Sequence, residues 1–147
     1  MTEIFDPLRL DNQICFPLYV CSKEVIRIYK PFLDELDLTY TQYIAMMALW
    51  EHQVLSVRQL GEILFLDSGT LTPVIKSLEK KGYVIRERSR EDERVVNVSL
   101  TGKGMDLRGQ ALTVPEKVGR CIDLPAEDAE ALYRILHKLS ANLAAKE

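Results

Sequence analysis

The sequence predicts a mostly α-helical fold that carries one small β-hairpin. Apolar residues recur every three or four positions through most of the chain, as in residues 71–78, and this spacing is typical of a helix with one buried face. From residue 96 to residue 100 apolar and polar residues alternate instead, which indicates a half-buried strand. Residues 84–88 can pair with it across a charged turn at 89–94. The expected order is four helices, a hairpin and two more helices.

The first helix is expected from residue 10 to about residue 36, with Asp11 as a candidate N-cap. Pro17 complicates this helix, because a proline in a helix interior costs about 3 kcal/mol. Either the helix bends at Pro17, or it starts later and holds Pro17 in its first turn. The sequence leaves both alternatives open.

The other five helices each start at a residue that favours a helix N-terminus. These starts are Thr39, Ser56, Asp67 or Ser68, Thr101 and Pro125. Gln42 and Gln59 follow the first two starts at the spacing of a capping box. Gly82 is expected to close the fourth helix.

Two short helices followed by a basic hairpin, or wing, are typical of the winged helix-turn-helix fold. Its second short helix enters the DNA major groove, and the wing reaches an adjacent groove or the backbone. The long first and last helices need a partner surface, and the last has a leucine stripe over 132–143. We expect one domain over 1–147, with a DNA-binding part at about 54–101. Dimerisation helices at about 8–36 and 102–145 would form a homodimer that reads two half-sites.

The composition is that of an ordinary globular protein, and the net charge alone does not indicate a nucleic-acid partner. The chain has 147 residues, a net charge of −3 and three cysteines without metal-ligand spacing. Residues 68–103 hold eight Lys and Arg against five Asp and Glu, a balance of +3, so the remainder carries −6. A basic segment in an acidic chain points to an anionic partner. We expect no membrane span, signal peptide, metal or cofactor, and a cytoplasmic location.

Several segments resemble one family of DNA-binding repressors. The stretch "DERVVNVSLT", from Asp92 to Thr101, is similar to the wing of MarR-type repressors. The segments "QICFPLY", "LTYTQY", "LWEH" and "FLDSGTLTPVIKSLEKKG" resemble the organic-hydroperoxide-sensing branch of that family, usually called OhrR. The similarity extends over essentially the whole chain. It implies a repressor, and not an enzyme, that releases its operator when an organic hydroperoxide oxidises a cysteine.

The resemblance makes Cys15 the peroxide sensor, with Tyr29 and Tyr40 hydrogen-bonded to its sulfur. A thiolate is the reactive form of cysteine, and both a helix N-terminus and neutral tyrosine donors favour an anion. Tyr19 follows Cys15 by four residues and is a weaker candidate for the same pocket. Without the resemblance, the tyrosines would be read as packing residues.

Distance along the helix constrains how these residues can meet. Tyr29 follows Cys15 by 14 residues, which places it on nearly the same helix face but about 21 Å away. A contact therefore needs the partner subunit's tyrosine, or a sharp bend near Pro17. We expect the partner subunit.

The other two cysteines have separate expected roles. Cys121 follows the fifth helix, in the connection to the last one, where a subset of the branch has a cysteine that forms a disulfide with the partner's sensor. A small cellular thiol could capture the oxidised Cys15 instead. Cys21 lies about 240° around the helix from Cys15, and we expect it to be a buried or half-buried bystander.

The candidate DNA-binding residues come from the fourth helix and the wing. They are Ser68, Gly69, Thr70, Thr72, Lys76, Arg86, Arg88, Arg90, Asp92 and Arg94. The small polar residues open the recognition helix and can meet phosphates or base edges. Arg94 is expected in the minor groove, oriented by Asp92, whereas Arg88 and Arg90 could equally form a solvated hairpin face.

Two other functions remain as alternatives. The chain could be a MarR-type repressor that responds to a small phenolic ligand, with Cys15 as a core thiol. It could also be a thiol peroxidase, although that function would leave the basic hairpin unexplained.

Overall fold

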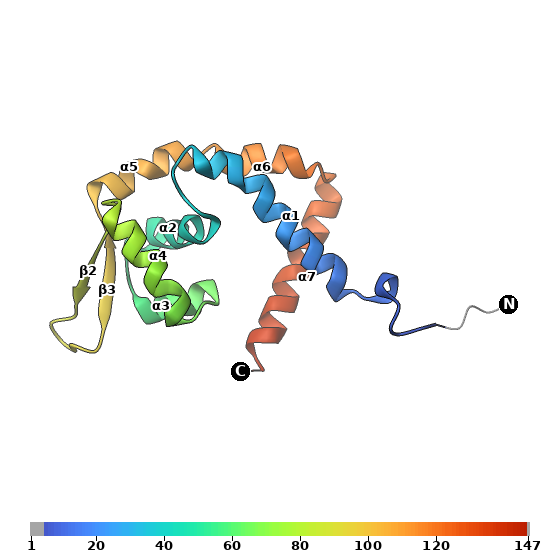
Figure 1. Ribbon diagram of the computed structural model, residues 1–147, viewed down its shortest axis with the longest axis horizontal. Coiled ribbons are helices and arrows are strands. Elements are labelled where there is room, and N and C mark those ends of the chain that lie inside the picture. Colours follow the sequence, from blue (N-terminus) through green and yellow to red (C-terminus); the bar gives the residue numbers. More distant parts are fainter. Residues whose placement is uncertain (1–4, 147) are drawn as a thin grey trace. The chain divides into compact units, whose positions relative to one another are not determined.

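The computed structural model describes residues 5–146 and contains seven α-helices and three strands in that range (Figure 1). The elements are α1 (Cys15–Asp34), α2 (Tyr40–His52), β1 (Val54–Ser56), α3 (Val57–Leu64), α4 (Ser68–Lys80), β2 (Val84–Arg88), β3 (Val96–Leu100), α5 (Gly102–Ala111), α6 (Val114–Ile122) and α7 (Ala126–Ala144). A short 3-10 helix, Leu10–Asn12, precedes α1. The expected mostly helical class with a small hairpin is confirmed.

The chain divides into two compact units, Met1–Val114 and Pro115–Glu147. The first unit contains all three strands and helices α1 to α5. The second contains most of α6 and all of α7. Among the described residues, no helix combines the length and the apolar character that crossing a bilayer requires.

The first helix starts later than its polar residues suggest. Asp11 lies in the 3-10 helix, and α1 begins at Cys15 with Ile14 as its N-cap, so the expected cap at Asp11 is wrong. Pro17 is the third residue of α1. The first four N–H groups of a helix have no partner within it, so a proline there removes no hydrogen bond. The late start is therefore correct, and Pro17 does not bend the helix interior.

Both predicted capping boxes are present. The side chain of Thr39 accepts from the backbone N–H of Gln42, and that of Ser56 accepts from Gln59. In each box the glutamine side chain accepts from the backbone N–H of the cap residue in return. These boxes fix the starts of α2 and α3 through local contacts alone.

The turn between α3 and α4 brings the two helices close together. Phe65 ends α3 in a left-handed conformation (φ 55°), and the N–H of Leu66 donates to the carbonyl of Gly61. A Cβ at Gly61 would lie 2.6 Å from the Leu66 oxygen, so this approach requires glycine. Asp67 then caps α4, whose end is followed by Gly82 at φ 84°.

The sheet has three strands in the order β1-β3-β2, all antiparallel. Strands β2 and β3 form the predicted hairpin, with Val84 paired to Leu100 and Arg88 to Val96. The short strand β1 pairs with β3 on its other side and was not predicted. We call β2, β3 and the turn between them the wing.

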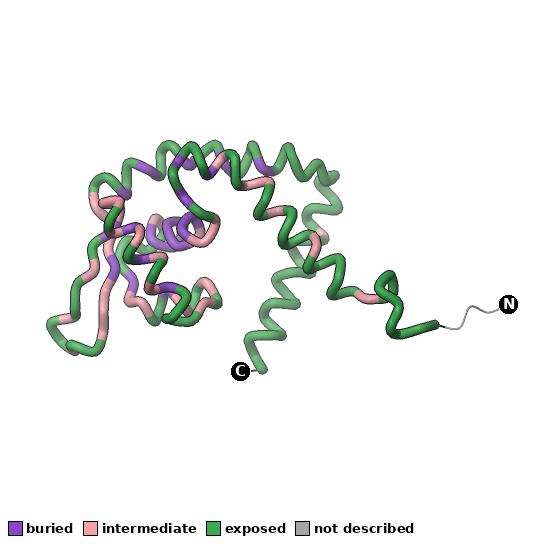
Figure 2. Tube along the Cα trace, in the orientation of Figure 1, coloured by how far each residue is buried: buried purple, intermediate pink, exposed green. Residues whose placement is uncertain are grey.

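The core of the first unit lies between α2, α3, α4 and the base of the wing (Figure 2). Its largest fully buried side chains are Leu33 from the end of α1 and Met46, Leu49, Leu60, Leu71, Ile75, Leu78, Val84 and Val98. Three of them belong to α4 and keep helical spacing. The opposite face of the recognition helix α4 is thereby left toward solvent.

The carboxyl-terminal part departs from the expected two helices. The helix capped by Thr101 ends at Ala111, and a separate helix, α6, follows from Val114 to Ile122. In the second unit, α7 carries the predicted leucine stripe, and Leu132, Leu136, Leu139 and Leu143 are 38–58% exposed in the single chain.

Candidate functional site

Cys15 is the first residue of α1 and is exposed in the single chain. The amino end of a helix carries partial positive charge and unpaired N–H groups, which favour an anion such as a thiolate. Cys21 and Cys121 are also free and exposed. The expectation that Cys21 is buried or half-buried is therefore wrong for the single chain.

Tyr29 and Tyr40 lie against each other as parts of an aromatic cluster between α1 and α2. Their ring centroids are 5.1 Å apart, in an edge-to-face arrangement. Tyr43 completes the cluster, with its ring 5.7 Å from that of Tyr29 and 6.4 Å from that of Tyr40. Sequence reasoning missed Tyr43, although its i+3 spacing from Tyr40 places both on one face of α2.

Burial raises the pKa of Tyr29 and of Tyr40, and the neighbouring Tyr40 raises that of Tyr29 further. Burial and both neighbouring rings raise the pKa of Tyr43 to about 12. The phenols therefore stay protonated at neutral pH. Each keeps a hydroxyl that can donate a hydrogen bond to an anionic sulfur.

One chain does not bring Cys15 to this tyrosine cluster. The helix α1 runs without interruption from Cys15 to Asp34, so Tyr29 lies about 21 Å along it from Cys15. Tyr19 is close to Cys15 in sequence, but it is 59% exposed, with the Lys23 ammonium 5.0 Å from its ring centroid. The sharp bend that would allow a contact within one chain is absent from α1.

A cavity of about 350 Å³ opens beside Tyr40, between α1 and the start of α2. Ile26, Leu33 and Leu38 give it an apolar wall, and Lys23, Arg27 and Lys30 line it on the α1 side. Arg27 is paired with Glu24, and Lys30 with Asp34.

Cys121 lies in the last turn of α6, not in the connection between helices where it was expected. It belongs to the second unit of the chain, whereas Cys15 belongs to the first. The expected sensor, Cys15, and the cysteine expected to form a disulfide with it, Cys121, thus belong to separate units of the chain.

The recognition helix α4 begins with the four small polar or glycine residues expected to meet DNA. Asp67 accepts from the N–H of Thr70 at 2.7 Å, and this hydrogen bond lowers the pKa of its carboxyl group. The hydroxyl of Thr72 donates to the carbonyl of Ser68 at 2.7 Å. Ser68, Gly69, Thr70 and Lys76 are exposed, and Thr72 is partly exposed.

Asp92 and Arg94 form the predicted ion pair at the tip of the wing. The Arg94 Nε donates to Asp92 Oδ1 at 3.0 Å, and its Nη2 donates to Oδ2 at 3.1 Å. These hydrogen bonds lower the pKa of Asp92. The Arg94 side chain is 90% exposed, so the pair orients a guanidinium that remains accessible to DNA.

The other wing arginines differ in how strongly the protein holds them. The Nε and Nη2 of Arg86 both donate to Glu79 Oε1 at 3.1 Å, which fastens β2 to α4. Arg88 donates to the carbonyl of Glu93 at 2.8 Å, and Arg90 is exposed. Arg86 therefore has a structural contact in addition to its expected role with phosphate.

A groove of about 780 Å³ joins the recognition helix to the wing. Thr72 and Lys76 line it from α4, and Arg94 lines it from the wing. Arg58 of α3 also lines this groove and was missed by sequence reasoning. Arg58 belongs to α3, which lies before the recognition helix in the sequence. Its position beside the wing becomes apparent only in the folded chain.

Comparisons with known proteins agree with this arrangement. Residues 27–109 match the family model described as transcriptional regulator SarA/Rot. The organic hydroperoxide resistance transcriptional regulator of Bacillus subtilis (strain 168) is 45% identical over 143 residues, covering 97% of each chain. The HTH-type transcriptional regulator SarZ of Staphylococcus aureus (strain USA300) is 49% identical over 127 residues, covering 86% of each chain.

Solved structures are similar over nearly the whole chain. The structure described as reduced AbfR bound to DNA has a TM-score of 0.75 and 33% sequence identity, covering 93% of this chain and 96% of that one. Overoxidized AbfR bound to DNA has a TM-score of 0.74 and 34% identity, covering 91% and 95%.

These relatives are transcriptional regulators, so they give no support to the alternative of a thiol peroxidase. The predicted winged helix-turn-helix fold and the predicted family are both confirmed. The chain belongs to the MarR family of winged helix-turn-helix regulators, in the branch of the organic hydroperoxide resistance regulators.

Proposed function

We propose that this protein is a homodimeric repressor that binds operator DNA when Cys15 is reduced and releases it when an organic hydroperoxide oxidises Cys15. The observation that carries the proposal is the position of Cys15. It is an exposed thiol at the first residue of a helix, in a chain 45% identical to an organic hydroperoxide resistance regulator. Operator binding would place the protein in the cytoplasm.

The chemistry needs only the thiol and the peroxide. The Cys15 thiolate attacks one peroxide oxygen, an S–O bond forms as the O–O bond breaks, and the alkoxide leaves and takes up a proton to become an alcohol. A second thiolate then attacks the sulfenic sulfur and expels hydroxide, which becomes water. We propose Cys121 of the partner subunit as the second thiol, with a small cellular thiol as the alternative.

The exposed apolar stripe on α7 supports a dimer, because an isolated chain would leave those leucines in water. The distance of about 21 Å along α1 also supports one, since only a second chain could bring Tyr29 and Tyr40 to Cys15. Residues 8–36 and 102–145 would dimerise, and residues 54–101 would contact DNA.

In the proposed complex, α4 enters the major groove with Ser68, Gly69, Thr70, Thr72 and Lys76. Arg94 enters the minor groove, and Arg86, Arg88 and Arg90 contact phosphates. Oxidation would move the DNA-binding parts of the two subunits, so that they no longer fit both half-sites of the operator at once. A change from 99% competent to 99% released requires a free-energy difference of about 5.5 kcal/mol between the two states.

The test is operator binding by the wild type and by Cys15→Ser, before and after one equivalent of an organic hydroperoxide. We expect the wild type to release DNA and the mutant to keep it. Equal release by both proteins, or by neither, would overturn the assignment of Cys15. It would then favour a small phenolic ligand, for which the cavity beside Tyr40 offers about 350 Å³.

A non-reducing gel of the same samples tests the resolving thiol. We expect a dimer-sized band that Cys121→Ser abolishes and that Cys21→Ser, the matched control, retains. A band that survives Cys121→Ser would exclude Cys121 from the disulfide. Oxidised wild type that forms no such band and releases DNA only when a small thiol is added would favour capture by that thiol.

A further inference from the structure

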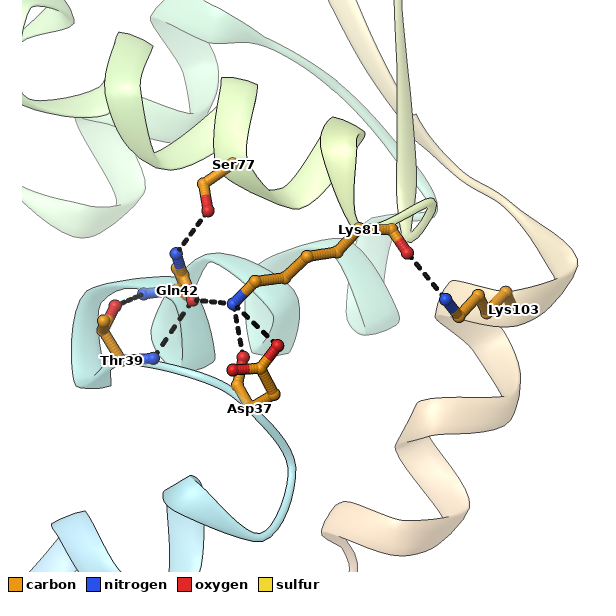
Figure 3. A network of polar contacts seen from close by, with 6 residues as sticks. All are labelled: Asp37, Thr39, Gln42, Ser77, Lys81 and Lys103. Carbon is orange, nitrogen blue, oxygen red and sulfur yellow. Dashed lines mark hydrogen bonds and ion pairs between the residues drawn. The ribbon is translucent and has the colours of Figure 1, made fainter.

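A network of polar contacts joins the α1–α2 corner to the end of the recognition helix (Figure 3). At its centre is Lys81, which follows α4 directly. Its ammonium donates to the carbonyl of Asp37 and to Gln42 Oε1, the latter at 3.1 Å, and forms an ion pair with Asp37 Oδ2 at 3.6 Å. An ammonium has three N–H donors, and this one has three acceptors around it, all in the α1–α2 corner.

Asp37 holds the backbone of that corner. It adopts a left-handed conformation (φ 53°), and the next residue, Leu38, donates its N–H to the carbonyl of Leu33 to close α1. Lys81 therefore binds the chain at the point where α1 turns into α2. Its own carbonyl accepts from Lys103 Nζ at 2.8 Å, which adds the start of α5 to the network.

Gln42 connects the same corner to the last turn of α4. Its Oε1 accepts from the N–H of Thr39 at 3.1 Å, and its Nε2 donates to Ser77 Oγ at 3.0 Å. The residue is only 7% exposed. Loss of a hydrogen-bond partner by a buried amide is unfavourable, so these two bonds favour one relative position of α2 and α4.

The first turn of α2 also carries two of the three tyrosines of the cluster, Tyr40 and Tyr43. Tyr40 and Gln42 are two residues apart, so their side chains leave the helix about 200° apart. Tyr40 faces the ring of Tyr29 on α1, and Gln42 faces Ser77 on α4. One helical turn thus contacts the tyrosine cluster on one side and the recognition helix on the other.

We infer that Gln42 and Lys81 are positioning residues that make the start of α2 and the recognition helix move together, so that a change at the tyrosine cluster displaces α4 from its half-site. The inference rests on the proposed function. Apolar packing between α2 and α4 is non-directional and tolerates small displacements of one helix along the other. The hydrogen bonds of Gln42 and Lys81 are directional, and they transmit the displacement.

The experiment compares Ser77→Ala and Lys81→Met with a matched control, Lys80→Met. Lys80 is an exposed lysine one residue away, so its mutation removes the same charge without touching the network. For each protein, operator affinity is measured in the reduced and the peroxide-oxidised state. The ratio of the oxidised to the reduced Kd reports the coupling, whereas a purely structural role would lower the Tm and leave this ratio unchanged.

We expect Lys81→Met to lower the ratio about tenfold, or about 1.4 kcal/mol. Ser77→Ala, which removes one hydroxyl and keeps the fold, should lower it about threefold, and Lys80→Met should match the wild type. Unchanged ratios in Ser77→Ala and Lys81→Met, beside a responsive wild type, would overturn this inference alone. A wild type that keeps its operator after peroxide would overturn the proposed function and this inference with it.

Discussion

The sensor should be assembled from two chains, and mixed dimers can test this directly. Cys15 and Tyr29 belong to one continuous helix and lie about 21 Å apart along it, which is too far for their side chains to meet. Tyr40 packs on Tyr29, so it is equally remote from the Cys15 of its own chain. If the tyrosines hydrogen-bond the reactive sulfur, they come from the partner subunit.

The expected effect of removing the tyrosine hydroxyls follows from the strength of such bonds. A hydrogen bond to a charged group contributes about 1.5–3 kcal/mol. Because oxidation proceeds through the thiolate, loss of one donor should slow it about tenfold to a hundredfold at neutral pH. The homodimer of Tyr29→Phe/Tyr40→Phe should therefore react at least tenfold more slowly than the wild type.

The decisive sample is a mixed dimer, purified through two different affinity tags. One chain carries Cys15→Ser, and the other carries Tyr29→Phe/Tyr40→Phe. A site built from two chains leaves one complete sensor in this dimer. We expect half of the wild-type amount of sulfenic acid, trapped by a dione reagent, to form with the wild-type rate constant.

The reciprocal control pairs a wild-type chain with one that carries Cys15→Ser, Tyr29→Phe and Tyr40→Phe. Its only Cys15 then faces phenylalanines across the interface and should react slowly. A site within one chain predicts the reverse in both samples. Cys15 would then be oxidised slowly in the first mixed dimer and at the wild-type rate in the control. That outcome would refute the reasoning from helix length.

Three further predictions concern DNA binding, the core and pH. Arg94→Ala should weaken operator binding by about 1–3 kcal/mol, measured by fluorescence anisotropy, and Asp92→Ala should weaken it less because Asp92 only orients the arginine; equal affinity for Arg94→Ala and wild type would contradict this. Leu71→Ala, at a fully buried position, should lower the free energy of unfolding in guanidinium chloride by about 2–5 kcal/mol. The pKa of Tyr43 is about 12 in the folded chain and about 10 in the unfolded chain. The free energy of unfolding should therefore decrease as the pH rises from about 10 to about 12, and Tyr43→Phe should reduce this decrease.

Elements with local causes could be predicted from the sequence. The capping boxes at Thr39 and Ser56 each need only residues within one turn, and both formed. The wing strands were also predicted, because alternation at 96–100 and the charged turn are visible without the fold. The pairing of Asp92 with Arg94 likewise needs only two neighbouring residues.

Elements with distant causes could not be predicted. Strand β1 has three residues and exists because Leu55 lies opposite Val98, which is 43 positions later in the sequence. Arg58 lines the groove between α4 and the wing only because α3 packs beside α4. The cap at Asp11 failed because capping preference competes with the placement of Pro17, which is tolerated only within the first turn of α1.

Gln42 shows how a local role can hide a distant one. The sequence identifies it as a capping-box residue, and the bond from the Thr39 N–H to its Oε1 confirms that role. The same side chain also meets Ser77 and Lys81, which lie 35 and 39 positions away. Capping uses the amide oxygen and leaves the amide nitrogen free to bind another element, so a residue that starts a helix can also fix where that helix sits. In this regulator, the first turn of α2 contacts Tyr29 through Tyr40 and the recognition helix through Gln42. The coupling that we infer would therefore carry a peroxide signal to α4 without any contact between Cys15 and the residues expected to bind DNA.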